Sequence, residues 1–98
     1  MKTHLKTIRR SHKREKKWDA VFVRSNGTQK VVPFGQRGYS DYTKHKDATR
    51  KQRYIRRHRG MHEDWTNPET PGALSRYILW EHPSFDESVK RFKKRFNV

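Results

Sequence analysis

Two β-prone runs rich in apolar residues flank Asn26 and Gly27 in the stretch from residue 18 to residue 34. An Asn-Gly pair supplies the positive φ angles of a two-residue type I′ turn, and runs of this kind are typical of strands. We therefore predict a β-hairpin over about residues 18–34, in which Phe22 faces Val31. This register places on one face Trp18, Ala20, Phe22, Val31 and Pro33. An isolated hairpin is marginal in water, so this face is expected to cover a helix or a partner strand.

Apolar residues with helical spacing occupy the C-terminal third of the chain. They recur at intervals of four, three and four positions, as Phe85, Val89, Phe92 and Phe96. Ser84, with Glu87 three residues later, forms a capping box ahead of this stripe. The pattern predicts a helix over about residues 84–96. Its later turns carry basic residues that suit the negative end of the helix dipole, namely Lys90, Arg91, Lys93, Lys94 and Arg95.

Start signals indicate two further short helices. Thr70 can cap a helix that has Pro71 at its first position and extends over about residues 71–81. Asp47 can cap another helix over about residues 47–59. This helix is basic on nearly every side, so it needs acidic partners or an anionic neighbour.

Together these elements predict an α+β fold, with a single small domain over residues 18–98 and the hairpin laid across the two C-terminal helices. Residues 1–17 contain only Leu5 and Ile8 as apolar anchors beyond the first methionine, so we predict a basic extended tail there. The predicted core consists of Phe22, Val31, Trp65, Leu74, Ile78, Trp80, Phe85, Val89, Phe92 and Phe96.

Charge is distributed unevenly along the chain. The 98 residues contain 25 Lys and Arg against 10 Asp and Glu, a net charge of +15. Residues 1–17 contribute +7, residues 18–34 +1 and residues 35–59 another +7, whereas residues 60–98 sum to zero. Because confined positive charge repels itself, an anionic surface is expected against the basic half. DNA, RNA, an anionic membrane or an acidic protein face would each serve.

Basic side chains are interleaved with tyrosines in this half. The residues expected to bind an anionic partner are Arg9, Arg10, Lys13, Arg14, Lys16, Lys17, Arg37, Lys44, Arg50, Arg53, Arg56 and Arg57. The rings of Tyr39, Tyr42 and Tyr54 could stack on bases, as in sequence-tolerant nucleic-acid binders. Alternatively, the tyrosines pack the loop onto the hairpin while the cations are simply solvated. No recognition-helix signature, zinc-finger spacing or RNA-recognition motif supports sequence-specific reading.

Signals of catalysis and metal binding are weak. The nearest approach is a group of polar residues close in sequence but without the fixed spacing of a zinc or nuclease site, His45, Asp47, His58 and His62. The chain has no cysteine, no phosphate loop and no convincing pair of catalytic carboxylates. We therefore predict that the protein is not an enzyme and has no cofactor, metal or small-molecule substrate. No run approaches the roughly 18 apolar residues of a transmembrane helix.

The run from Phe34 to Phe96 resembles a family of small, uncharacterised proteins encoded by large nucleocytoplasmic DNA viruses, including viruses of algae. The positions that carry this resemblance are residues 38–43 (GYSDYT), His45, Asp47, Tyr54, Arg57, His58, Asp64, Trp65, Gly72, Leu79 and Trp80. No catalytic role is attached to the pattern. The resemblance therefore implies a viral source and setting rather than a mechanism.

Two functions from different classes follow. The first is a minor capsid protein of a large DNA virus, which bridges coat or inner-layer proteins and is located in the virion, or in the host cytoplasm or nucleus during assembly. The second is a sequence-nonspecific nucleic-acid-binding protein that packages or escorts the genome. The resemblance and the small core favour the first. Charge alone does not decide, because a protein with a net charge of +15 binds DNA at low salt in either case.

Overall fold

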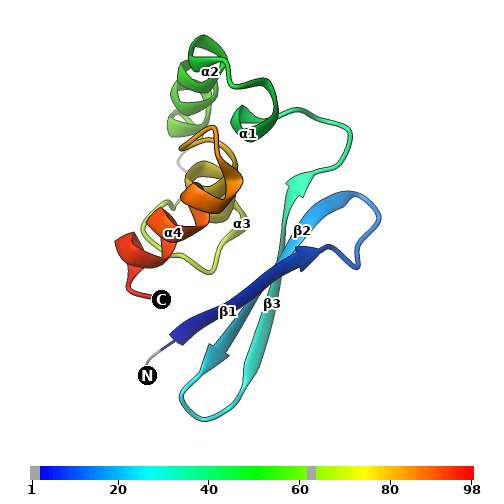
Figure 1. Ribbon diagram of the computed structural model, residues 1–98, viewed down its shortest axis with the longest axis vertical. Coiled ribbons are helices and arrows are strands. Elements are labelled where there is room, and N and C mark those ends of the chain that lie inside the picture. Colours follow the sequence, from blue (N-terminus) through cyan, green and yellow to red (C-terminus); the bar gives the residue numbers. More distant parts are fainter. Residues whose placement is uncertain (1–2, 62–63) are drawn as a thin grey trace.

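The structure, a computed structural model, describes residues 3–61 and 64–98. Three strands come first along the chain and the helices follow (Figure 1). The elements are β1 Thr3–Arg10, β2 Lys16–Arg24, β3 Gln29–Gln36, α1 Tyr42–His45, α2 Ala48–Arg59, α3 Pro71–Leu74, η1 Ser75–Leu79 and α4 Phe85–Phe96. The π-helical turn η1 continues α3, and it closes with a hydrogen bond from the Trp80 N–H to the Ser75 carbonyl at 3.1 Å.

The strands form one antiparallel sheet in the order β1-β2-β3, and the helices gather on one side of it (Figure 1). Both α3 and η1 contact β3, and α4 packs on η1. Helices α1 and α2 lie at one end of the long axis, whereas the turn between β2 and β3 lies at the other (Figure 1). The predicted α+β class is confirmed.

The N-terminal segment differs from the predicted tail. Residues 3–10 pair with β2, and Leu5, opposite Phe22, is completely buried. The register shifts just after Leu5, which leaves Lys6 as the extra residue of a β-bulge. Because of this bulge, Leu5 and Ile8 both face the core although they are three positions apart. Two apolar anchors suffice here because they complete a sheet that β2 and β3 already form.

The hairpin between β2 and β3 forms at the predicted place but with a longer turn. The Gly27 N–H donates to the Arg24 carbonyl at 2.8 Å, and the Arg24 N–H donates to the Thr28 carbonyl at 2.9 Å. Gly27 has a φ of +86°. This arrangement is a three-residue loop with a glycine at the bulge position instead of the predicted two-residue turn. The extra loop residue moves the pairing register by one.

The changed register decides which side chains of β3 face the helices. Val31 and Pro33 lie on the face away from the core, so the predicted core position of Val31 was wrong. Val32 and Phe34 face the helices instead, with 5% and 0% of their surface exposed. A one-residue slip has this effect because side chains alternate between the two faces of a strand.

Each predicted helix is present, with small differences at its ends. The predicted capping residues all accept a backbone hydrogen bond through the side-chain oxygen, and they are Asp47 for α2, Thr70 for α3 and Ser84 for α4. The helix expected over residues 71–81 is built from α3 and η1 and ends at Leu79. The short helix α1, capped by Asp41, was not predicted.

One core joins the sheet to the helices. Its buried members are Leu5, Ala20, Phe22, Val32, Phe34, Leu74, Ile78, Leu79 and Phe92. Four further predicted core residues are partly buried and pack against this cluster, Trp80, Phe85, Val89 and Phe96. Trp65 is not part of it, so its predicted core position was wrong. Its ring lies instead 5.5 Å from the guanidinium of Arg76.

Candidate nucleic-acid interface

Two neighbouring grooves lie where the sheet meets α1 and α2. The first, which we call the α2 groove, has a volume of about 460 Å³ and lies between the paired ends of β2 and β3, α2 and the α3-η1 helix. Its cationic side chains are Lys16, Arg50 and Arg57, in addition to Lys17. The second, the loop groove, has a volume of about 620 Å³, and its further cations are Arg10, Arg37 and Lys44.

Tyr39 lines both grooves, as do Lys17 and Ser40. The Tyr39 side chain is 66% exposed, which is unusual for a large aromatic residue. It follows Gly38, whose φ of +92° turns the chain between β3 and α1. The result is an open phenol ring between two sets of cations.

The other two tyrosines predicted to stack on bases are already engaged within the protein. The Tyr54 ring lies between His58 and Trp80, with ring centroids 4.0 Å and 4.3 Å away, and only 8% of the residue is exposed. Tyr42 is half-buried, and the ammonium of Lys51 lies 5.2 Å from its ring centroid. Tyr54 is therefore a packing residue that lines the α2 groove, and its predicted stacking role was wrong.

Lys17 was predicted to bind an anionic partner, but its charge is satisfied internally. Its Nζ lies 2.7 Å from the Asp41 carboxylate, and the two side chains are only 12% and 2% exposed. Asp41 also accepts hydrogen bonds from the backbone N–H and the hydroxyl of Thr43 and so caps α1. This buried pair ties the start of β2 to α1, which fixes the boundary between the two grooves.

Gly35 allows the sheet and the α3-η1 helix to approach closely beside the α2 groove. Its φ is +78°, a conformation that favours glycine. A Cβ atom at this position would lie 2.9 Å from the Leu79 side chain and 3.3 Å from the Cβ of Lys17. The width of the groove at this point therefore depends on the absence of a side chain.

A buried carboxylate organises the loop between β1 and β2. Asp19 is fully buried and accepts hydrogen bonds from the Ser11 hydroxyl at 2.6 Å and the His12 N–H at 3.1 Å. Burial alone would raise the pKa of Asp19, but the hydrogen bonds from His12 and Ser11 outweigh it and lower that pKa. The ordered loop holds together the strand ends that carry Arg10 and Lys16.

Histidine chemistry in this region is structural. The Nδ1 atom of His45 accepts a hydrogen bond from the Asp47 N–H at 2.9 Å, and its ring lies 5.3 Å from that of Trp80. Burial and the nearby charge of Arg50 lower the pKa of His45, so the neutral ring is favoured. In the part of the chain that the structure describes, which excludes His62, no three His, Asp or Glu side chains are grouped to hold a metal ion.

The structure selects among the predicted cations. Those that line the two grooves with Tyr39 are Arg10, Lys16, Arg37, Lys44, Arg50 and Arg57. Four others are exposed but line neither groove, namely Lys13, Arg14, Arg53 and Arg56. Arg9 Nε lies 3.9 Å from the Asp19 carboxylate. The candidate surface is therefore smaller than the basic half of the chain.

Sequence reasoning missed a third basic groove, because the lysines of α4 were interpreted only as complements of the helix dipole. Lys90, Lys93 and Lys94 line it together with the start of β1. Their spacing of three and four positions places them on one side of the helix, and this is the signal that could have identified the groove.

The comparisons with known proteins relate the N-terminal half of the chain to one family. No described helix is long and apolar enough to cross a membrane. No match to the chain was found among curated proteins or solved structures. Residues 6–58, from β1 to the end region of α2, match a family of unknown function (DUF5754). Because this match spans more than half of the 98 residues, the chain belongs to that family.

Proposed function

We propose that the protein binds single-stranded nucleic acid without sequence preference across the α2 groove and the loop groove. The observation that carries this proposal is the 66% exposed ring of Tyr39 between two sets of cations. Lys and Arg side chains neutralise phosphates, and an exposed aromatic ring stacks on any base. The two features together match the chemistry of a single strand whose bases are turned outward.

The cations of the grooves come from elements that are far apart in sequence. Arg10 ends β1, Lys44 belongs to α1, and Arg50 and Arg57 belong to α2. The fold gathers them around one ring, although their mutual repulsion opposes this arrangement. A polyanion would relieve that repulsion and release its own counterions, which supports a backbone of phosphates as the ligand.

Replacement of the exposed ring tests the stacking part of the proposal. We expect Tyr39→Ala to weaken binding of a fluorescent oligo-dT about 5- to 150-fold, because stacking contributes about 1–3 kcal/mol per base. Tyr39→Phe keeps the ring and should bind like the wild type. Fluorescence anisotropy at near-physiological salt measures both. An equal loss for Tyr39→Ala with duplex DNA would contradict single-strand stacking.

Two neighbouring arginines of α2 test the phosphate part. Arg57 lines the α2 groove, whereas Arg56 is exposed outside it. We expect Arg57→Gln to reduce the slope of log affinity against log salt by about 0.7, the value for one phosphate of a single strand. Arg56→Gln removes the same charge and should change the slope less. Identical slopes for the two variants would mean that charge alone binds the oligonucleotide.

The role in a virus particle stays a prediction, as do its coat-protein partners and its location in the virion. It was favoured by the resemblance and by the small core, and residues 1–17 were expected to form a basic extended tail. In the structure, β1 is held by β2 of the same chain. The ordering of this segment therefore needs no neighbour, and the Tyr39 grooves favour the nucleic-acid proposal. Both proposals share the prediction that the protein is not an enzyme.

A further inference from the structure

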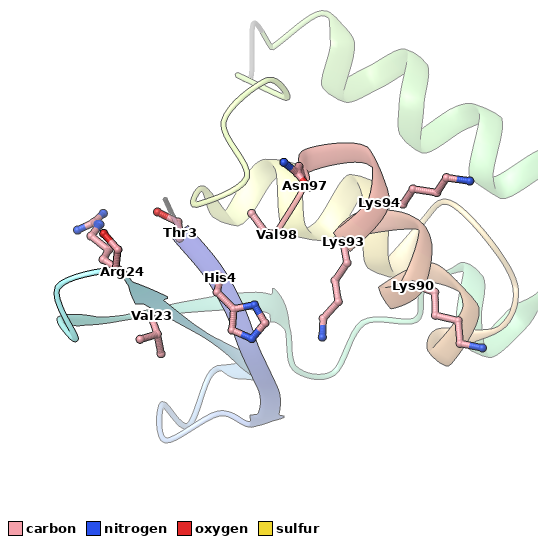
Figure 2. A pocket seen from close by; sticks show the side chains of 10 residues that line it. Thr3, His4, Val23, Arg24, Lys90, Lys93, Lys94, Asn97 and Val98 are labelled. Carbon is pink, nitrogen blue, oxygen red and sulfur yellow. The ribbon is translucent and has the colours of Figure 1, made fainter. Parts of the chain in front are cut away.

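The third basic groove lies between α4 and β1, which is an edge strand of the sheet. It consists of two adjoining cavities of about 630 and 280 Å³, both lined by Lys93 of α4. One wall is β1 from Thr3 to Ile8, joined in the larger cavity by Val23, Arg24 and Ser25 at the end of β2, and the other wall is α4 with Val98. Figure 2 shows His4 of β1 and Lys93 of α4 in the space between the two elements. We call it the β1-α4 groove.

The backbone of β1 is the first feature that suggests a ligand. β1 is an edge strand, because the sheet order is β1-β2-β3. Edge strands present backbone N–H and C=O groups with which another extended chain can pair. The part of β1 that lines the groove, residues 3–8, is about 20 Å long at about 3.3 Å per residue. This length suits a segment of about six residues in strand conformation.

The side chains that line the groove are of two kinds. Its apolar members include Ile8, Phe85 and Val89, all partly buried. Its cationic members include Lys6 of β1 and, on α4, Lys90, Lys93 and Lys94. One carboxylate, that of Asp86, is present among the described lining residues. An extended chain points its side chains alternately to two sides. Such a chain could therefore place apolar residues on the apolar lining residues and carboxylates beside the lysines.

Charge argues against a second copy of this chain as the occupant. Pairing of β1 with β1 of another molecule would bring together two strands that each carry Lys6, Arg9 and Arg10. Like charges on paired strands are destabilising, and lysine on an edge strand is a common protection against such pairing. An acidic strand would be attracted by the same residues.

The chemistry of the groove also differs from that of the Tyr39 grooves. Phe85 lines it, but its ring packs against Trp18, with 4.9 Å between the centroids. The α4 wall supplies lysines, which are compact point charges, and the guanidinium of Arg24 in the opposite wall is already paired with Glu69 at 2.8 Å. An open strand edge and partly buried apolar side chains give no advantage to a phosphate backbone. They are the elements that recognise an extended peptide.

We propose that the β1-α4 groove binds an acidic, extended segment of a protein partner, which adds to the sheet as a fourth strand beside β1. The lysines of α4 bind the carboxylates of the segment. The apolar side chains that line the groove contact the residues that alternate with those carboxylates. This site is separate from the Tyr39 grooves, so a single molecule could hold a nucleic acid and a protein partner at once.

The test uses a fluorescein-labelled peptide of alternating Val and Glu, about eight residues long, and the full-length protein. We expect Lys93→Glu to weaken its binding by at least about tenfold at near-physiological salt, because the charge faces the ligand. The matched control is Lys13→Glu in the exposed loop between β1 and β2, which makes the same charge change outside the groove. Lys90→Glu, also exposed on α4, is a second groove variant in case Lys93→Glu disturbs folding.

A second peptide with alternate backbone amides methylated isolates the strand pairing. It has the same charge but cannot donate the ladder hydrogen bonds, so we expect weak binding and no slowing of amide hydrogen exchange in residues 4–8. Equal binding of both peptides, or equal losses for Lys93→Glu and Lys13→Glu, would overturn the proposal. Stronger protection of β1 by oligo-dT than by the peptide would assign the groove to nucleic acid. The Tyr39 variants should leave peptide binding unchanged, so the two proposals fail separately.

Discussion

The Tyr39 grooves and the β1-α4 groove carry the same sign of charge but are built from different groups. Around Tyr39, arginines and lysines from four elements surround an open aromatic ring. Along β1, lysines from one helix face a strand edge and partly buried apolar side chains. The difference shows that the net charge of a groove indicates only the sign of the charge on its ligand. The aromatic rings, backbone groups and apolar atoms beside those charges indicate the chemical class of the ligand.

The largest expected effect follows from a substitution that removes core packing beneath the β1-α4 groove. Phe92 is fully buried, and α4 supplies a wall of the β1-α4 groove. We expect Phe92→Ala to lower the free energy of unfolding by about 3–5 kcal/mol, the usual cost of this truncation in a core. Urea denaturation measures it, and Arg91→Ala at the adjacent exposed position is the control. A loss similar to that of the control would show that α4 is not packed as described.

A smaller effect is expected at the wall of the α2 groove. We expect Gly35→Ala to cost about 1–3 kcal/mol beyond the backbone cost of its positive φ, and to weaken oligonucleotide binding, because the new methyl group would press on Leu79. Gly27→Ala is a matched control, since Gly27 also has positive φ but nothing within 4 Å of the added carbon. It should show the backbone cost alone, about 1–2 kcal/mol, and leave binding unchanged. Equal losses of oligonucleotide binding would remove Gly35 from the groove.

The smallest effect concerns pH and the Tyr39 side of the comparison. Burial and the charge of Arg50 lower the pKa of His45, although Asp47 and Asp41 act in the opposite direction. The unfolded chain therefore takes up this proton more readily, and the free energy of unfolding should fall as pH drops below the ordinary value of 6.5. Urea titrations between pH 8 and pH 5 should show a weaker dependence for His45→Gln. A variant at an exposed residue that keeps its charge over this range, Arg56→Gln, should keep the wild-type dependence.

The helices could be predicted from sequence because their signals are local. A capping residue and an apolar stripe lie within one element, and Asp47, Thr70 and Ser84 act where these signals placed them. β1 could not be predicted in the same way, because the bulge at Lys6 interrupts the alternation that identifies a strand. The spacing of Leu5 and Ile8 matches a buried strand only once the bulge is known.

The register of the hairpin could not be predicted from local sequence signals either. The pair Asn26-Gly27 is compatible with a two-residue and a three-residue loop, and the two differ by one position in β3. The observed register buries Val32 and Phe34 against the helices rather than Val31. That choice depends on the surface that the helices offer, which lies far away in the sequence.

The sequence predicted the kinds of residue in the candidate site, but not which individual arginines and tyrosines line the grooves. In a helix with arginine on most sides, the sequence does not indicate which arginine side chains face a groove. Arg57 and Arg56 differ only in their position around α2. Likewise, Tyr39 and Tyr54 are both surrounded by cations in the sequence. Only contact with His58 and Trp80 makes Tyr54 a buried packing residue.

The sequence by itself determined the α+β class, the helices with their caps, the position of the hairpin and the positive charge of the candidate surface, because each depends on neighbouring residues or on composition. The tertiary structure decided that β1 joins the sheet, which face of β3 is buried, and that Tyr39 rather than Tyr54 stays open. It also brought Lys93 to the edge of β1. These outcomes depend on contacts between segments distant in sequence, and only the competition of side chains for one small core selects among the alternatives.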